Sequence, residues 1–241
     1  MARRKLPALT FEIAGPTHDE ELRRLLRETA MPGTISVSME REPDFFLGAT
    51  VEGDRHDTVV VRLDCEPLRL VGLGTRSVHN AFVNGEKRRL GYLGQVRVDP
   101  SYRRGMAVLK RGFGKIKQLH DADDVTFYTT TIVEDNEAAR RVLTRGWKGL
   151  PTYRERERLV TLIIPAWRRR PEVHSSRFAM REATEADLPR IAACLQRVWS
   201  RFQFAPAWTA DDLASAERTR GLSPGDFTIA LTGGEVVGCV A

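Results

Sequence analysis

The stretch GYLGQVRVDPSYRRGMA, residues 91–107, decides how the rest of the chain is interpreted. A run rich in β-branched residues ends at Pro100, and a basic segment with helical spacing follows Gly105. A helix that starts just after a strand leaves unpaired backbone N–H groups at its first turn, and these bind anions. Arg103 and Arg104 add charge-assisted donors, and Gly105 lets the backbone approach a ligand closely. The stretch therefore predicts either a phosphate-binding loop or an ordinary strand–turn–helix with solvated arginines.

Length and composition limit the classes of protein to consider. The chain has 241 residues, of which 41% are hydrophobic and 29% charged, as in a chain that forms one large globular domain or two small ones. It contains no apolar run near the roughly 18 residues that span a bilayer. The opening MARRKLPALT lacks the apolar region of a signal peptide, and three widely separated cysteines suggest neither disulfides nor a zinc site. We expect a cytoplasmic protein without a membrane or metal partner.

Positive charge is concentrated beside the quoted stretch. The net charge is +6, and the segment from Pro100 to His120 contains six lysines and arginines and no acidic residue. Such a cluster fits a phosphate-bearing ligand, a nucleic acid or a solvated surface. The acidic run Asp121–Asp124 lacks the spacing of a calcium loop, so we expect a solvated turn there.

Hydrophobic periodicity predicts a mixed α/β chain. The Asn84-Gly85 pair predicts a tight hairpin turn between two of the strands. Asp135 or Asn136 is expected to cap a late helix that Gly146 ends. The predicted strands cover residues 9–16, 57–63, 68–85, 88–98 and 124–133, and the predicted helices cover 17–30, the basic segment after Gly105 and 134–147.

The C-terminal part repeats the beginning of the chain. RFAMREATEADLPRIAACL (177–195) matches TFEIAGPTHDEELRRLLRE (10–28) as strand, turn, acidic cap and amphipathic helix. The repeated strand residues keep their spacing, since Ile13 to Val71 is 58 positions and Met180 to Val237 is 57. This pattern predicts a duplication. We expect a complete domain over 1–164, a linker over 165–177 and an incomplete second copy over 178–241.

Two motifs in this order resemble the GNAT superfamily of acyl-CoA-dependent N-acetyltransferases. The resemblance covers roughly residues 8–160, and the repeat restarts the family's opening near Phe178. It implies the GNAT acyltransferase fold, a mixed α/β fold with a splayed central sheet, followed by a partial second GNAT-like repeat. The matching residues are Val98, Pro100, Tyr102, Arg103, Gly105 and Ala107 in the first motif, and Asn136, Ala139, Gly146 and Trp147, in place of the family's Phe, in the second.

The resemblance implies a site for acetyl-CoA where two parallel strands diverge. The pantetheine arm would pair with the backbone of Val96 to Val98, and the pyrophosphate would bind the amides from Arg103 to Ala107. A backbone N–H near Val96 or Arg97 would stabilise the oxyanion formed at the thioester. Asn136 would contact the pantetheine arm, and Ala139 would let its helix pack closely. The implied cofactor-binding residues are Val96, Arg97, Val98, Arg103, Arg104, Gly105, Met106, Ala107, Asn136 and Ala139.

The catalytic positions depart from the family pattern. Tyr102 stands where the family's loop has Arg or Gln, and Leu143 stands where the family often has a tyrosine that protonates the leaving thiolate. Near the position of the family's glutamate base, the chain has Gln95 and Tyr92. The catalytic candidates that remain are Tyr128 and Tyr153, each with the alternative role of a packing aromatic.

Three functions follow as hypotheses. The first is transfer of an acetyl group from acetyl-CoA to an amine acceptor by direct attack. The second is a non-catalytic acyl-CoA-binding or regulatory module, which the missing acid and base positions favour. The third is nucleic-acid binding through phosphate contacts of the basic helix. We do not expect the third, because no motif of stacking aromatics accompanies the basic residues. The sequence identifies neither the acceptor nor the oligomeric state.

Overall fold

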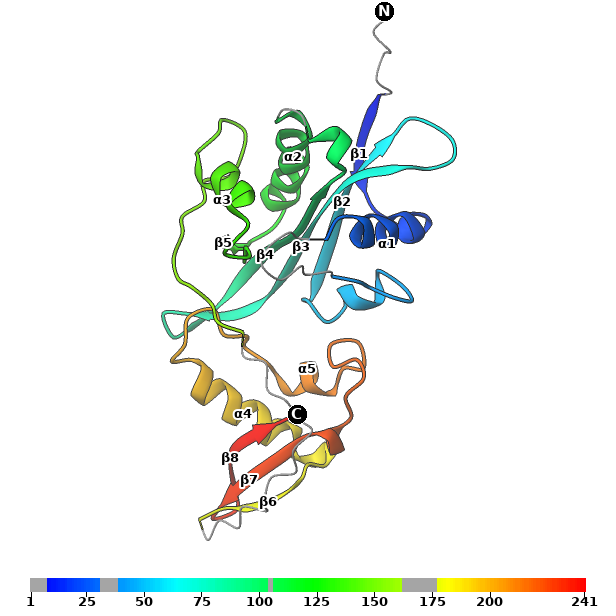
Figure 1. The fold of residues 1–241 in the computed structure, drawn as a ribbon. Helices are drawn as coiled ribbons and strands as arrows, with labels where there is room; N and C mark the ends of the chain where they lie inside the picture. Colours follow the sequence, from blue (N-terminus) through cyan, green and yellow to red (C-terminus); the bar gives the residue numbers. More distant parts are fainter. Residues whose placement is uncertain (1–7, 31–38, 104–105, 162–176) are drawn as a thin grey trace, which may run out of the picture. The chain divides into compact units, whose positions relative to one another are not determined.

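The computed structural model describes residues 8–30, 39–103, 106–161 and 177–241 (Figure 1). The chain divides into two compact units. The first consists of Met1–Thr152 and Trp199–Ala207, and the second of Tyr153–Val198 and Trp208–Ala241. No helix among the described residues has the length and apolar character to cross a membrane.

The first unit is built on a five-stranded sheet in the order β1-β2-β3-β4-β5 (Figure 1). The first four strands are antiparallel neighbours, and β5 pairs with β4 in parallel. Asn84 and Gly85 join β3 to β4 with φ of 54° and 82°, the left-handed values that a tight hairpin turn requires. The predicted mixed sheet and hairpin are therefore confirmed. The strands are β1 (Leu9–Ile13), β2 (Arg55–Leu63), β3 (Leu70–Val83), β4 (Glu86–Val98) and β5 (Phe127–Thr129).

Helices α1 (Asp19–Glu28) and α2 (Ala107–Asp121) pack on opposite faces of this sheet. The side chains of neighbouring residues in a strand point to opposite faces of the sheet, and β2 has buried valines on both faces. Val60 joins the apolar cluster formed by the buried leucines of α1, whereas Val61 joins the cluster that contains Val108 of α2. The sheet therefore has an α1 face and an α2 face. A third helix, α3 (Glu137–Thr144), follows β5.

Residues 199–207 extend the first sheet along β3. The pairing of β2 with β3 ends where Arg55 meets Val78, whereas β3 continues to Val83. Beyond that point Phe82 N donates to Ala205 O at 2.9 Å, and the N–H groups of residues 204 and 207 donate to the carbonyls of residues 82 and 80. The segment after α4 therefore replaces β2 as the neighbour of this end of β3.

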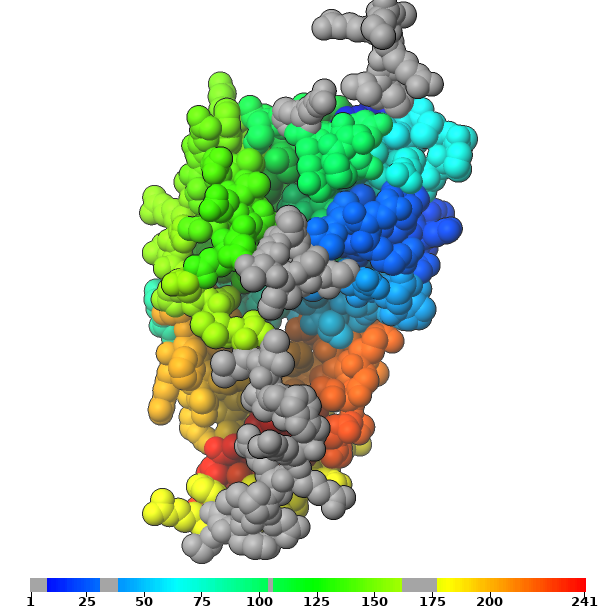
Figure 2. All heavy atoms as spheres, viewed as in Figure 1, coloured from blue at the N-terminus to red at the C-terminus, as the bar shows by residue number. Residues whose placement is uncertain are grey.

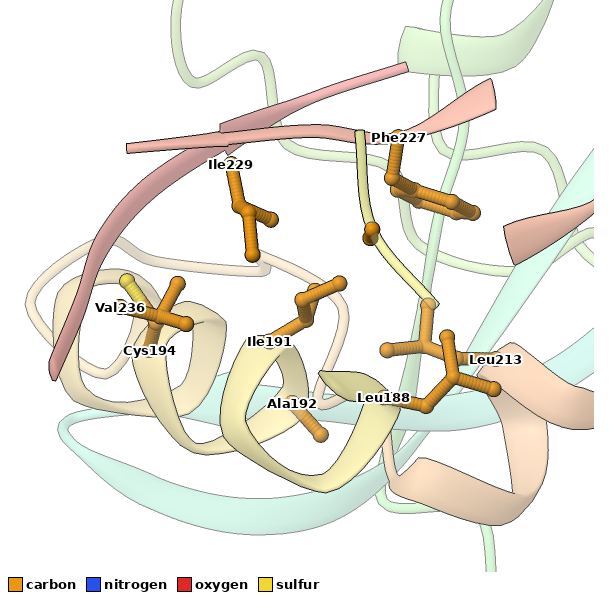
Figure 3. Close-up of a cluster of buried hydrophobic side chains, with 9 residues drawn as sticks. Leu188, Ile191, Ala192, Cys194, Leu213, Phe227, Ile229 and Val236 are labelled. Atoms are coloured by element: carbon orange, nitrogen blue, oxygen red, sulfur yellow. The ribbon is translucent and has the colours of Figure 1, made fainter. Parts of the chain in front are cut away.

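The second unit is a three-stranded antiparallel sheet in the order β6-β7-β8 with two helices. Figure 3 shows its core, in which Ile191 and Cys194 of α4 face Ile229 and Val236 of the sheet. Apart from the additional helix α5, the order of strand, helix, strand and strand is that of β1, α1, β2 and β3. The duplication stays a prediction. The predicted linker lies outside the described residues except for Arg177. The elements are β6 (Ala179–Glu182), α4 (Leu188–Trp199), α5 (Ala210–Ala214), β7 (Thr228–Thr232) and β8 (Glu235–Val240).

Short 3-10 turns connect several elements. One of them, Pro100–Tyr102, directly follows β4 and begins the connection to α2. The others are Pro16–His18, Leu47–Ala49, Glu185–Asp187 and Pro224–Asp226. Over the described ranges, no three His, Cys, Asp or Glu side chains are grouped so as to hold a metal ion.

Candidate functional site

Strands β4 and β5 diverge halfway along β4. They pair only over three positions, Leu90 with Phe127, Gly91 with Tyr128 and Tyr92 with Thr129. β4 then continues to Val98, and within the described chain no strand pairs with its outer edge there (Figure 1). The strand predicted over 124–133 is therefore shorter than expected, because the chain leaves β4 after Thr129. The divergence creates the open edge, defined here as the unpaired side of residues 93–98.

A β-bulge lies in the middle of the open edge. In the register of β3 and β4, Thr75 faces Gly94 but Leu73 faces Arg97, so β4 uses one residue more than β3. Gln95 has a φ of 50°, the left-handed region that non-glycine residues rarely adopt. Bulges of this kind change the direction of the backbone and are frequent next to active sites.

The bulge and the register determine which backbone groups face the open edge. Asp99 N donates to Val71 O at 2.8 Å, so the backbone of Asp99 faces β3. Because successive residues of a strand turn their N–H and C=O groups to alternate edges, those of Val98 and Val96 face the open edge. Those of Arg97 face β3. Of the predicted contact residues, Val96 and Val98 therefore turn their backbone groups toward the open edge, and Arg97 does not.

The loop after β4 leads into the start of α2. Asp99 Oδ1 accepts from Ser101 N at 2.9 Å, and Tyr102 packs against the apolar cluster below α2. Helix α2 has Met106 at its N-cap, without a side-chain cap and without an acidic residue in its first turn. The first N–H groups of this helix are thus available to an anion. Arg104 and Gly105, both predicted to bind the cofactor, lie outside the described residues.

Helix α3 begins as the sequence indicates. Asn136 is its N-cap, and its Oδ1 accepts from Ala139 N at 3.1 Å. After the helix, the Lys110 ammonium of α2 lies 5.9 Å from the centre of the Trp147 ring. Figure 2 shows the surfaces of α2 and of the α3 segment next to each other. Asn136 and Ala139 therefore occupy a helix that follows the diverging strand and ends beside α2.

Tyr128, a candidate catalytic residue, belongs to a buried polar network on the α2 face. Its ring lies over Gly91, so a Cβ atom added to Gly91 would be 2.1 Å from Cδ1 of Tyr128. Tyr128 Oη accepts from Arg76 Nε at 2.8 Å. Arg76 is 0% exposed and also binds Asp57 at 2.8 Å and Asp123 at 2.7 Å. The hydroxyl of Tyr128 is thus held by a structural ion-pair network, and its catalytic role stays a prediction.

Asp123 corrects one expectation from the sequence. We expected Asp121–Asp124 to form a solvated turn, but the side chain of Asp123 is only 11% exposed and pairs with Arg76. The hydrogen bond from Arg76 lowers the pKa of Asp123 from 3.8 to about 2. Local spacing could not indicate this role, because Arg76 lies 47 residues earlier in the chain.

Tyr153, the other catalytic candidate, belongs to the second unit. Burial raises its pKa to about 12, so its hydroxyl keeps its proton at neutral pH. A retained proton is compatible with the role of an acid. The assignment stays a prediction.

A polar cluster beside the bulge was not found from the sequence. Arg41 pairs with Glu52, and the carboxamide oxygen of Gln95, in the orientation that satisfies both of its polar atoms, accepts from Arg41 Nε at 3.1 Å. Glu52 also lies 3.2 Å from His56 Nδ1 and 3.0 Å from Ser77 Oγ. These residues lie on the α1 face, since His56 Nε2 is 3.2 Å from the Thr58 hydroxyl on the same side of β2 as Val60.

The Glu52 carboxylate is ionised in this environment. Burial raises its pKa, but the hydrogen bond to His56 and the charge of Arg41 outweigh that effect and bring the pKa below its ordinary value. The sequence signal was a Glu four residues before a His at the start of β2, which alone is too common to indicate a site.

Comparison with known proteins places this geometry in context. No family model and no curated protein matches the sequence. The aminoglycoside N-acetyltransferase AAC(6')-Iy in complex with CoA is similar in structure, with 18% identity, 68% of this chain and 99% of that chain covered, and a TM-score of 0.50. A Trypanosoma brucei acetyltransferase has 18% sequence identity and a TM-score of 0.47, and the match covers 65% of this chain and 100% of that chain. A ribosomal-protein-alanine N-acetyltransferase from Brucella melitensis has 12% sequence identity and a TM-score of 0.45, and the match covers 64% of this chain and 99% of that chain.

Identity at this level indicates a shared fold and leaves activity open. The order of strands, the parallel pairing of β4 with β5 and their divergence are the features expected from the two sequence motifs. The chain therefore has the fold of the GNAT superfamily of acetyltransferases.

Proposed function

We propose that the chain transfers an acetyl group from acetyl-CoA to an amine acceptor in the cytoplasm. The observation that carries this proposal is the open edge of β4, with its bulge at Gln95, followed within ten residues by the uncapped start of α2. Unpaired strand backbone suits the amides of a pantetheine arm, and a helix N-terminus suits a diphosphate.

The edge groups of Val96 and Val98 pair with the pantetheine amides in this proposal. The diphosphate lies at the loop between Arg103 and Ala107, where Arg103, Arg104 and the amides of Gly105 and Met106 contact it. Asn136 and Ala139 border the pantetheine arm from α3. The placement of Val96 and Val98 on the open edge supports this arrangement.

The proposed chemistry is direct attack of the amine nitrogen on the thioester carbonyl carbon. The amine attacks as its neutral free base, after giving a proton to water. The C–N bond forms, the C–S bond breaks and the thiolate leaves, and the nitrogen of the new amide loses a further proton to water. Val96 N–H, which faces the open edge, is the proposed donor to the oxyanion, in preference to Arg97 N–H, which faces β3. Tyr128 and Tyr153 remain the proposed donors of a proton to the thiolate.

We place the acceptor on the α1 face, because the polar cluster beside the bulge lies on that face. On the α1 face the Glu52 carboxylate lies beside the bulge, within the cluster that includes Arg41 and His56. Its negative charge would attract a cationic amine toward the thioester. A cationic acceptor is therefore the class of substrate to test first, with aminoglycosides among the probes.

Two measurements test the proposal. Calorimetry should detect binding of CoA, and Gly105→Val should weaken it because a side chain in the loop would obstruct the diphosphate, whereas Lys117→Gln should not. A turnover screen with acetyl-CoA and a set of amines should release free thiol. Equal affinity of the wild type and Gly105→Val for CoA would disprove the proposed cofactor site. CoA binding without turnover of any amine would support the non-catalytic module.

A further inference from the structure

The two buried arginines of the first sheet have very different surroundings. Arg76 is 0% exposed and has two carboxylates and a tyrosine hydroxyl as partners. Arg97 is 8% exposed, yet its Nε has no hydrogen-bond partner, and no carboxylate of the described residues forms an ion pair with it. Its one hydrogen bond in the described structure runs from Nη1 to Val96 O at 3.1 Å.

A second positive charge lies close to Arg97. Burial and the nearby Arg103 guanidinium lower the pKa of Arg97. Removing a charge from water without a counter-charge is costly, and a like charge adds to that cost. Buried charges in folded proteins are normally paired or bind a ligand. Among the described residues, the Arg97 guanidinium therefore lacks the negatively charged partner that a buried cation normally has.

Both guanidinium groups rest on the open edge. Arg97 Nη1 donates to Val96 O, and Arg103 Nε donates to Val98 O at 2.8 Å. These two carbonyls are two residues apart on one strand edge, so they are about 7 Å apart. They are also the acceptors that the proposed pantetheine arm would use. The arginine side chains thus occupy the acceptors in the ligand-free chain.

We propose that Arg97 binds the diphosphate of the acyl-CoA together with Arg103, and that the cofactor exchanges partners with both side chains. The pantetheine amides take over the carbonyls of Val96 and Val98, and the released guanidinium groups bind the phosphate oxygens. Arg97 is therefore a cofactor-binding residue through its side chain, and it recognises the nucleotide part of the ligand. This inference rests on the proposed function, because it takes acyl-CoA as the ligand.

The test compares Arg97→Met with Arg88→Met, which removes an arginine from an exposed part of the same strand. Calorimetry measures the affinity of each protein for CoA, for pantetheine and for inorganic pyrophosphate. We expect Arg97→Met to bind CoA and pyrophosphate about 10- to 100-fold more weakly, the loss typical of a hydrogen bond to a charged group. Binding of pantetheine should not weaken, because the variant leaves the carbonyl of Val96 free for it, and Arg88→Met should behave as the wild type.

Thermal unfolding without ligand gives an independent readout. Because Arg97→Met removes an uncompensated buried charge, it should unfold at a higher temperature than the wild type, while gaining less from added CoA. A variant that has simply lost its fold would unfold at a lower temperature, so misfolding cannot imitate the expected result.

The outcomes separate this inference from the proposed function. If the wild type and Arg97→Met bind CoA equally, the role of Arg97 is wrong and the CoA site stands. If pyrophosphate binds only when Arg97 is present but CoA does not bind at all, the anion site stands and the proposed function is wrong. If the wild type binds neither CoA nor pyrophosphate, both proposals are wrong.

Discussion

Replacing Arg76 by methionine tests the buried ion-pair network most directly. The substitution keeps much of the side-chain length but removes the buried cation that Asp57 and Asp123 contact at 2.8 and 2.7 Å. The partly exposed Arg55, at 3.3 and 3.4 Å, is then the cation that remains beside them. Removing one partner of a buried ion pair typically costs about 3–5 kcal/mol. Because Arg55 partly compensates the two carboxylates, we expect a loss at the lower end of that range at neutral pH. The loss should be smaller when Asp57→Asn and Asp123→Asn are added, since the buried negative charges are then gone.

The pH dependence should reverse between wild type and variant. In the wild type, the pKa of Asp123 is lowered from 3.8 to about 2, so its contribution is complete above pH 4 and is lost as the pH falls toward 2. A shift of this size is worth about 2 kcal/mol at most. In Arg76→Met two neighbouring carboxylates share only the partly exposed Arg55, so protonation is favoured and acid should stabilise the variant relative to neutral pH.

The assay is unfolding in urea, monitored by hydrogen exchange of the backbone amides of β2 and β3. These amides report on the stability of this sheet alone. Measurements at neutral pH, near pH 4 and near pH 2 give the pH dependence of the unfolding free energy of each protein, and Arg88→Met is the control because its side chain is exposed. A variant that unfolds at the urea concentration of the wild type would refute the reasoning. So would equal dependence on pH in the two proteins.

Three further predictions concern the site. Glu52→Gln should raise the KM for a cationic amine about tenfold and leave the affinity for CoA unchanged, in steady-state assays with a neutral amine as control. Asn136→Ala should destabilise α3 by about 1 kcal/mol, because the cap to Ala139 N is lost, as measured by hydrogen exchange of α3 against the unaffected α1. Tyr128→Phe and Tyr153→Phe should each lower kcat if the residue protonates the thiolate, and full kcat for both over about pH 6 to 9 would assign that proton to solvent.

The sequence predicted the parts of the fold that local chemistry determines. The hairpin at Asn84-Gly85 was predicted because that pair tolerates left-handed backbone, and the loop after β4 was predicted from Pro100 and Gly105. Asn136 was one of the two residues expected to cap the start of α3. It is the N-cap, and its side-chain oxygen accepts a hydrogen bond from Ala139 N. In each case the signal lies within a few residues of the structure that it indicates.

The features that the sequence did not reveal depend on residues far apart in the chain. The bulge at Gln95 contains no glycine of its own and is visible only in the register of β4 against β3. Arg76 and Arg97 are both arginines in strands, and only the fold shows that one meets two carboxylates and the other meets none in the described structure. Burial of a charge is set by tertiary pairing, so local pattern cannot separate these two residues.

The hydrogen bonds between residues 204–207 and the end of β3 bear on where the chain can be divided. Phe82 N donates to Ala205 O, so the sheet of the first unit is completed by a segment that follows α4 in the sequence. A fragment that ended at residue 164 would leave Asn80 to Phe82 as a bare strand edge, which invites association with other chains. A boundary chosen from the sequence alone would therefore yield a fragment that aggregates more readily than the intact chain.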